Sequence, residues 1–279
     1  MHLLKSCLFN IALALFSLAG ISMALAAPAS ITTSKERTMN VASITTKPTI
    51  ILVHGAFADS SSWDGVAKEL LALGYPVIAA ANPLRSVKSD ADYVASVVKN
   101  VNGLVVLVGH SYGGSVITNA AHGNENVKAL VYVSAFAPDT GETVAELSGK
   151  FPGSTLGSAL TPPVALPDGG VDLYIQQDKF RAQFAADVAS AQANLMAVTQ
   201  RPITNLALNE PSATPAWKTI PSWFIFGSLD KNIPLAALSF MAQRAGSRKT
   251  VEVKGASHVV MVSHPDAVAR IVAEAATAK

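Results

Sequence analysis

The strongest constraint on the fold is a repeated alternation between short apolar runs and segments with helical periodicity. A continuous apolar run that ends at glycine, such as "TIILVHG" (49–55), is typical of a strand buried on both faces. Further strands of this kind are predicted at 75–83, 103–110, 127–138, 222–228 and 249–255. Strands that alternate with helices predict an α/β fold, in which helices cover both faces of a mostly parallel central sheet.

The segments between these runs place apolar residues at helical spacing. Residues 60–74 show the pattern clearly and end at Gly74, a common helix stop signal. Residues 90–101 form another predicted helix, with Asp90 expected as its N-cap. Further helices are predicted at 112–121, 234–246 and 265–278.

The alternation breaks between Asp139 and about Thr219, where proline and glycine become frequent. Two helices are predicted inside this segment, within residues 172–198. An insertion here would extend over the carboxyl edge of the sheet, where α/β proteins bind ligands. We therefore expect residues 139–219 to form a helical lid within a domain that spans 48–279.

The N-terminus has the pattern of a signal peptide. Lys5 precedes a long apolar stretch (7–26), which ends in the small residues of Ala24-Leu25-Ala26. The stretch is about long enough to be a membrane anchor, but no basic cluster follows it. We expect residues 1–26 to be cleaved and 27–47 to be a disordered lead-in. The protein would then be exported, to the periplasm or the medium, without a stable membrane anchor.

Cysteine content and charge exclude several function classes. Cys7 is the only cysteine and lies in the predicted signal peptide, so the mature chain has no disulfide, thiolate metal ligand or cysteine nucleophile. The chain carries 21 basic and 19 acidic residues, a nearly neutral balance. Since no basic run occurs, we expect no nucleic-acid partner.

A serine lies between glycines where the predicted strand 103–110 gives way to a helix. The sequence Gly109-His110-Ser111-Tyr112-Gly113 has the Gly-x-Ser-x-Gly spacing of a nucleophile elbow. In such an elbow the turn is so sharp that only small residues fit two positions before and after the nucleophile. The alternative is a structural turn with an incidental serine. The strand–turn–helix context favours Ser111 as a catalytic nucleophile held at a helix N-terminus.

A serine nucleophile needs a base, and this architecture orders the residues as serine, acid, histidine. His258 follows the predicted strand 249–255 and would lie at the same edge of the sheet as Ser111. His264 is the alternative, but its place before Pro265 is typical of a helix cap or surface residue. We therefore predict His258 as the general base. The remaining histidines are His2, His54, His110 and His122.

The acid is expected near the end of the preceding strand. Asp230 lies a few residues beyond the strand 222–228 and would orient the imidazole of the base. Asp139 is the main alternative, because it follows the strand 127–138. Acids of the predicted lid are weaker candidates, namely Asp172, Asp178 and Asp187.

A tetrahedral oxyanion requires two backbone donors. The N–H of Tyr112, directly after the nucleophile, supplies one, and the loop "HGAF" after the first strand supplies the other, at Ala56. Gly55 would let this loop pass close to the site. His54 would either buttress the loop or contact substrate, and buttressing is the preferred interpretation.

Several of these segments resemble a known family. "LVHGAFADSSSW", "LVGHSYGG", "LVYVSAFAPDTGET", "GSLDKNIP" and "VKGASHVVMVSHP" are similar to the α/β-hydrolase superfamily. The similarity is greatest to its branch of small esterases, plant methyl esterases and hydroxynitrile lyases, and covers 49–138 and 220–278. It implies an α/β-hydrolase fold with Ser111, Asp230 and His258 as a triad and Ala56 and Tyr112 as oxyanion donors. It fades over the predicted lid, so no substrate carries over.

The predicted activity is hydrolysis of a small-molecule ester through an acyl-enzyme, with no metal or organic cofactor. Alternatives on the same scaffold are a cofactor-free lyase of the hydroxynitrile type, a perhydrolase and a non-catalytic binding protein. Lyase chemistry would be favoured by a lysine near the histidine, and Lys231 and Lys254 are near it in sequence. The sequence leaves the oligomeric state open. Candidate substrate-binding residues are Phe57, Phe136, Tyr174 and Phe184.

Overall fold

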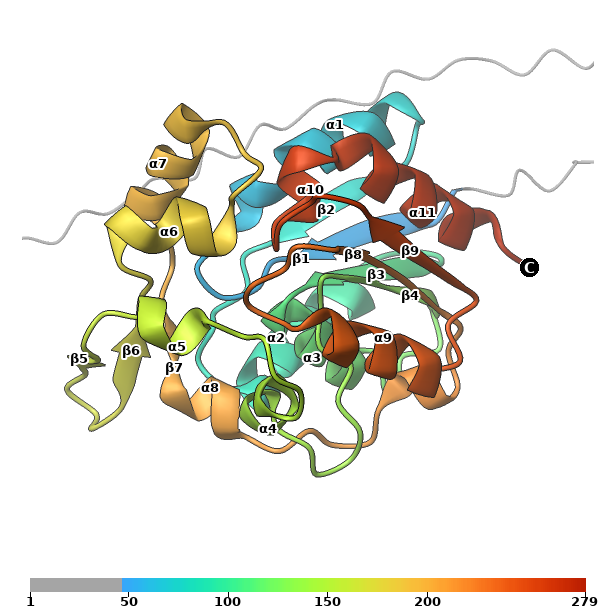
Figure 1. Ribbon diagram of the computed structural model, residues 1–279. Helices are drawn as coiled ribbons and strands as arrows, with labels where there is room; N and C mark the ends of the chain where they lie inside the picture. Colours follow the sequence, from blue (N-terminus) through green and yellow to red (C-terminus); the bar gives the residue numbers. More distant parts are fainter. Residues whose placement is uncertain (1–46) are drawn as a thin grey trace, which may run out of the picture. The chain divides into compact units, whose positions relative to one another are not determined.

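The computed structural model describes residues 47–279, and its centre is a six-stranded sheet (Figure 1). The strand order is β2-β1-β3-β4-β8-β9, and every neighbouring pair is parallel. The predicted α/β fold with a mostly parallel sheet is thereby confirmed. The strands are β1 (Thr49–Val53), β2 (Val77–Ala80), β3 (Val105–His110), β4 (Val127–Val133), β8 (Ser222–Gly227) and β9 (Lys249–Val253).

The predicted signal peptide (1–26) and nearly all of the predicted lead-in (27–47) lie outside the described residues. Both remain predictions from the sequence, as does export. Within residues 47–279, no helix is long and apolar enough to span a bilayer.

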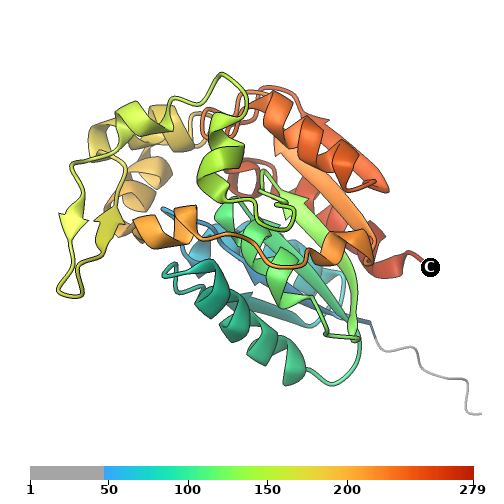
Figure 2. The same cartoon turned by 90° about the horizontal axis from the view of Figure 1, so that it is seen from below.

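The central strands are buried on both faces, which explains their continuous apolar sequences. No residue from Ile50 to Val53 or from Val105 to Val108 exposes any surface. Helices α1 and α11 cover one face of the sheet, and α2, α3 and α9 cover the other (Figures 1 and 2). These helices are α1 (Asp64–Ala72), α2 (Val87–Lys99), α3 (Tyr112–Ala120), α9 (Leu235–Arg244) and α11 (Pro265–Thr277). The short helix α10 (Val260–Ser263) precedes α11.

The N-terminus of α2 differs from the prediction. The helix begins at Val87, and the side chain of Ser86 accepts the capping hydrogen bond from the N–H of Ser89. Asp90 therefore lies inside the helix, where it is fully buried and accepts a 2.9 Å hydrogen bond from the Tyr112 hydroxyl. Its carboxylate also accepts the backbone N–H of Arg85, just before the helix, so it combines a local hydrogen bond with the tertiary one.

Residues 139–219 connect β4 to β8, and we call them the insertion. The two predicted helices are present as α6 and α7, and the two views place them at one end of the molecule (Figures 1 and 2). A three-stranded antiparallel sheet, β5-β6-β7, was not predicted. The insertion contains α4 (Val144–Gly149), α5 (Leu156–Ala159), β5 (Val164–Ala165), β6 (Val171–Leu173), α6 (Gln177–Phe184), α7 (Ser190–Thr199), β7 (Ile203–Thr204), α8 (Asn205–Asn209) and η2 (Ala216–Lys218).

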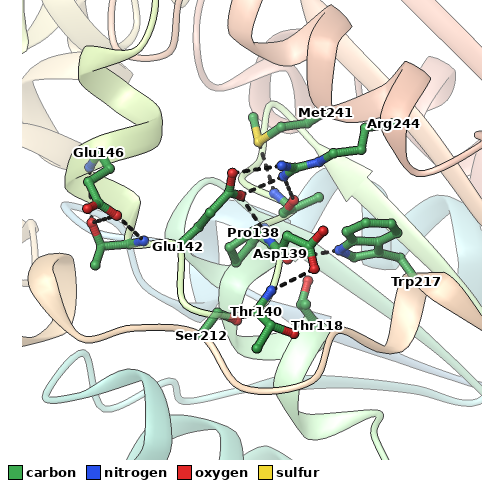
Figure 3. Close-up of polar contacts among 12 residues, drawn as sticks. Thr118, Pro138, Asp139, Thr140, Glu142, Glu146, Ser212, Trp217, Met241 and Arg244 are labelled. Atoms are coloured by element: carbon green, nitrogen blue, oxygen red, sulfur yellow. Dashed lines mark hydrogen bonds and ion pairs between the residues drawn. The ribbon is translucent and has the colours of Figure 1, made fainter.

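The start of the insertion is fixed by a polar cluster between β4 and α9 (Figure 3). The Arg244 guanidinium donates to both carboxylate oxygens of Glu142, each at 2.7 Å, and to the carbonyl of Ala137 at 2.8 Å. The indole N–H of Trp217 donates to the carbonyl of Pro138 at 2.9 Å. Burial raises the pKa of Glu142, but the bonds from Arg244 and the Asp139 N–H outweigh it, so the pKa is lowered.

Replacement of Arg244 with methionine is expected to destabilise the protein by about 2 kcal/mol at neutral pH. The change leaves a half-buried carboxylate and a carbonyl without their charged donor. Because the folded pKa of Glu142 is lowered, its stabilisation is present above its unfolded pKa. The difference between variant and wild type should shrink as pH falls through the folded pKa.

Urea unfolding at several pH values measures this difference. Arg270→Met is the matched control, because Arg270 forms a mostly exposed pair with Asp266 within α11, worth less than about 0.5 kcal/mol. Equal losses of unfolding free energy in the two variants would show that the Glu142–Arg244 pair does not fix the start of the insertion.

Candidate active site

Ser111 occupies a sharp turn between β3 and α3. Its φ of 54° and ψ of −124° lie in a region that side-chain-bearing residues rarely adopt. The flanking glycines are needed for close approach of the backbone. A Cβ atom at Gly113 would lie 2.4 Å from the carbonyl oxygen of Val53, and one at Gly109 would lie 2.5 Å from the carbonyl oxygen of Gly113. The turn therefore has the geometry that the Gly-x-Ser-x-Gly spacing predicts.

His258 and Asp230 form a buried pair at the carboxyl ends of β9 and β8. The Nδ1 atom of His258 lies 2.7 Å from Oδ2 of Asp230, and neither side chain exposes more than 1% of its surface. The other carboxylate oxygen accepts the N–H groups of Asn232 at 2.8 Å and Ile233 at 2.9 Å. With Nδ1 donating to the carboxylate, Nε2 is free to accept a proton. It is buried and has no hydrogen-bond partner among residues 47–279.

His110 joins the elbow to the loop that carries His258. Its Nε2–H donates to the carbonyl oxygen of His258 at 3.2 Å, and the two imidazole rings lie 4.7 Å apart. Burial lowers the pKa of His110 well below its ordinary value, so the ring is neutral with one N–H. No role for His110 was predicted from the sequence. Its place beside Ser111 was visible in the sequence, but its partner was not.

The hydroxyl of Ser111 and Nε2 of His258 are not hydrogen-bonded to each other in this structure. Catalytic hydrogen bonds of this kind are often long before substrate binds and shorten in the complex. The structure thus brings together the histidine and the acid directly, and the serine and the histidine through His110.

The alternative acids and the alternative histidine have other partners. Asp139 pairs with Lys218, and this hydrogen bond lowers its pKa. Its carboxylate also accepts the N–H of Thr140 (Figure 3). Asp172 pairs with Arg85 at 2.8 Å. The remaining candidates are Asp178, exposed on α6, Asp187, which accepts from Ser257, and His264, 3.7 Å from Asp187.

The loop after β1 lies against the elbow. A Cβ atom at Gly55 would be 2.7 Å from Cβ of Ser111 and 3.1 Å from the nitrogen of Tyr112. The N–H groups of Ala56 and Tyr112 donate to no other group in the described part of the chain. Both residues line the same cavity as Ser111, so these two unpaired donors lie at the site.

His54 supports this loop from beneath. Its Nδ1–H donates to the carbonyl of Gly55 at 2.9 Å, and its own carbonyl accepts from the Asn82 side chain at 2.9 Å. Burial lowers the pKa of His54 to about 4, so the ring is neutral at physiological pH. These contacts favour the buttressing interpretation.

A cavity of about 340 Å³ opens at Ser111, within the size range of small-molecule sites. Most of its lining side chains are apolar and come from the β1 loop, α3, α4, α8 and the segment after β8. Of the predicted substrate-binding residues, Phe57 and Phe136 line it. Phe184 lies behind the site instead, 5.2 Å from the His258 ring, and Tyr174 is not among the lining residues.

Metal chemistry has no evident ligand set in this region. Within residues 47–279, no group of three or more histidine, cysteine or acidic side chains is arranged to hold a metal ion. What the arrangement can do is acyl transfer: it holds a serine and two unpaired N–H donors at one cavity, and an oriented imidazole in the loop that His110 joins to that serine.

Several known proteins resemble this chain. A curated alpha-hydroxynitrile lyase of Arabidopsis thaliana is 25% identical over 237 residues, which cover 77% of this chain and 92% of the relative. Methylesterase 1 of the same plant is 24% identical over 242 residues, covering 78% and 92%. The crystal structure of polyneuridine aldehyde esterase has the same fold, with a TM-score of 0.72, 20% identity and coverage of 82% and 99%.

The model of the alpha/beta hydrolase family matches residues 50–271. This range contains all the site residues described above and the whole central sheet apart from the first residue of β1. The family is one of hydrolases, and the proteins similar to this chain include esterases. This chain therefore belongs to the alpha/beta hydrolase family.

Proposed function

We propose that the protein is a serine esterase, which hydrolyses carboxylic esters of small molecules through an acyl-enzyme. The observation that carries the proposal is the buried His258–Asp230 pair, whose free Nε2 lies in the loop held against the Ser111 elbow. The family supports hydrolysis in general, and the methylesterase and aldehyde esterase relatives support an ester as the bond that is cleaved.

The reaction begins when Oγ of Ser111 attacks the ester carbonyl and its proton moves to Nε2 of His258. Asp230 stabilises the imidazolium, and the N–H groups of Ala56 and Tyr112 bind the oxyanion. The bond to the alcohol then breaks, and the alcohol leaves with the proton from His258. Water next gives a proton to His258 and attacks the acyl-serine. Collapse of the second intermediate returns the proton to Ser111 and releases the acid.

Lyase activity is the main alternative among the similar proteins, because one of them is a hydroxynitrile lyase. The structure offers no observation that favours it. The Lys231 ammonium donates to the carbonyl of Ala182 in α6, Lys254 is exposed, and no lysine lines the cavity among the described residues. We therefore propose no lyase function.

The proposal is tested by labelling the mature protein with a fluorophosphonate probe and assaying 4-nitrophenyl acetate and butanoate. We expect one probe per chain, attached to Ser111 by peptide mass mapping, and saturable turnover of at least one ester. Mandelonitrile cleavage serves as the parallel lyase assay. Folded protein that neither reacts with the probe nor hydrolyses the esters would refute the esterase, and mandelonitrile cleavage alone would replace it with the lyase.

A further inference from the structure

The catalytic cavity contains a buried polar side chain that the proposed mechanism does not use. Asn232 lies two residues beyond Asp230, is 3% exposed and lines the cavity that opens at Ser111. The other unassigned polar groups of the lining, Ser148 and Ser154, are half-buried residues of the insertion. Asn232 is thus the deeply buried polar group of an otherwise largely apolar wall.

The orientation of this amide follows from its neighbours. Gln183 of α6 donates from Nε2 to the carbonyl of Lys231 at 3.0 Å, and its Oε1 accepts from the Thr155 hydroxyl at 2.8 Å. The atom of Asn232 that lies 2.7 Å from Gln183 Nε2 must therefore be the acceptor, Oδ1. The NH₂ group consequently points away from Gln183.

That NH₂ group has no protein partner. Nδ2 of Asn232 donates no hydrogen bond to any described residue. Nor does it belong to the side-chain atoms of residues 47–279 that are both unpaired and inaccessible to solvent. It therefore borders open space, and the space that Asn232 lines is the catalytic cavity. An unpaired amide N–H facing an apolar cavity is costly unless a ligand or water accepts from it.

The position of Asn232 relative to the reacting atoms is rigid. Its backbone N–H donates to Asp230 at 2.8 Å, so the residue that carries the free amide also holds the acid. Replacing the side chain leaves this backbone bond in place. The side-chain amide can thus bind substrate, while only the backbone of Asn232 contributes to the hydrogen bonds of Asp230.

We infer that Asn232 donates a hydrogen bond to an oxygen of the substrate other than those of the scissile ester. The preferred substrates are then esters with an ether, keto or hydroxyl oxygen in the group that fills the cavity, rather than plain alkyl esters. This inference rests on the proposed esterase function and adds a substrate class to it. A plain alkyl chain of the same size would fill the cavity and leave the amide unpaired.

The test compares esters of equal shape that differ by one oxygen. In the acyl arm, 4-nitrophenyl methoxyacetate, 3-methoxypropanoate and 4-methoxybutanoate are paired with butanoate, pentanoate and hexanoate. In the alcohol arm, 2-methoxyethyl acetate is paired with butyl acetate. For each pair, the ratio of kcat/KM values is divided by the ratio of hydroxide-catalysed rates, which removes intrinsic reactivity.

In wild type we expect this normalised ratio to be about tenfold in favour of oxygen in at least one pair, and the arm that shows it identifies the acyl or alcohol side. Asn232→Leu should bring the ratio close to one. Gln183→Leu, which frees the amide to rotate, should lower it by a smaller factor. Asn100→Leu, at the exposed asparagine that follows α2 as its C-cap, should retain the wild-type ratio.

A wild-type ratio near one in every pair, with alkyl esters turned over, would overturn the inference and leave the esterase proposal standing. A ratio that Asn232→Leu does not change would overturn it as well. The wild-type comparison needs no variant, so it decides the question even if Asn232→Leu does not fold. Absence of turnover for all esters would refute the esterase proposal itself, and the inference with it.

Discussion

Replacement of Ser111 with alanine is expected to reduce kcat for 4-nitrophenyl butanoate by about 10⁴-fold or more, with the fold intact. The loss follows from removal of the only atom that can form the acyl-enzyme in the proposed mechanism, and nucleophile deletions in serine hydrolases have effects of this size. Stability should change by less than about 1 kcal/mol, because alanine keeps the Cβ atom and thus the same backbone strain at φ 54°.

Ser111→Gly separates the catalytic role of the serine hydroxyl from the backbone strain at this position. It should be as inactive as Ser111→Ala but more stable than wild type by about 1 kcal/mol, because glycine adopts positive φ without steric cost. Steady-state kinetics and urea unfolding of both variants measure the effects. Full activity of Ser111→Ala would show that another group is the nucleophile, and a Ser111→Gly variant less stable than Ser111→Ala would show that the turn is unstrained.

Replacement of Gly113 with alanine is expected to destabilise the protein by about 3 kcal/mol or more. The new Cβ would lie 2.4 Å from the carbonyl oxygen of Val53 and 2.9 Å from that of His54. Val53 belongs to β1, which is buried and paired on both sides, so the backbone cannot yield without disturbing the sheet.

Gly157→Ala in α5 is the matched control. A Cβ atom there meets nothing within 4 Å, so the change should be neutral or slightly stabilising. Thermal and urea unfolding of the two variants give the comparison directly. Similar stability of Gly113→Ala and Gly157→Ala would mean that the elbow tolerates a wider turn than the structure contains.

The central sheet was predictable because burial of a strand on both faces is visible in the sequence of that strand alone. Residues 50–53 of β1 and 105–108 of β3 are all apolar since both faces are covered, and no partner needs to be known to recognise that pattern. The positions of Asp230 and His258 followed from the same logic, because residues after parallel strands share one edge of the sheet. The close approach of the two side chains, at 2.7 Å, is consistent with that placement, and their catalytic roles remain proposals.

The insertion was predictable only in part, because its small elements depend on distant contacts. β5 and β7 have two residues each, too few for periodicity to appear. β6 is held partly by the Asp172–Arg85 pair, which joins residues far apart in sequence. The burial of Asp90 is a similar case, since a capping residue and a buried acceptor for Tyr112 have the same local pattern.

Helix α6 has a consequence for how the enzyme can change its specificity. Gln183 of α6 bonds to the segment that carries Asp230, and the carbonyl of Phe184 accepts from Ser257, the neighbour of His258. No residue of α6 lines the cavity, so mutations in α6 would act on it only through displacement of Asp230 and His258. Mutations selected for new substrates, in nature or in the laboratory, should accumulate instead in α4 and α8, where Val144 and Leu208 line the cavity.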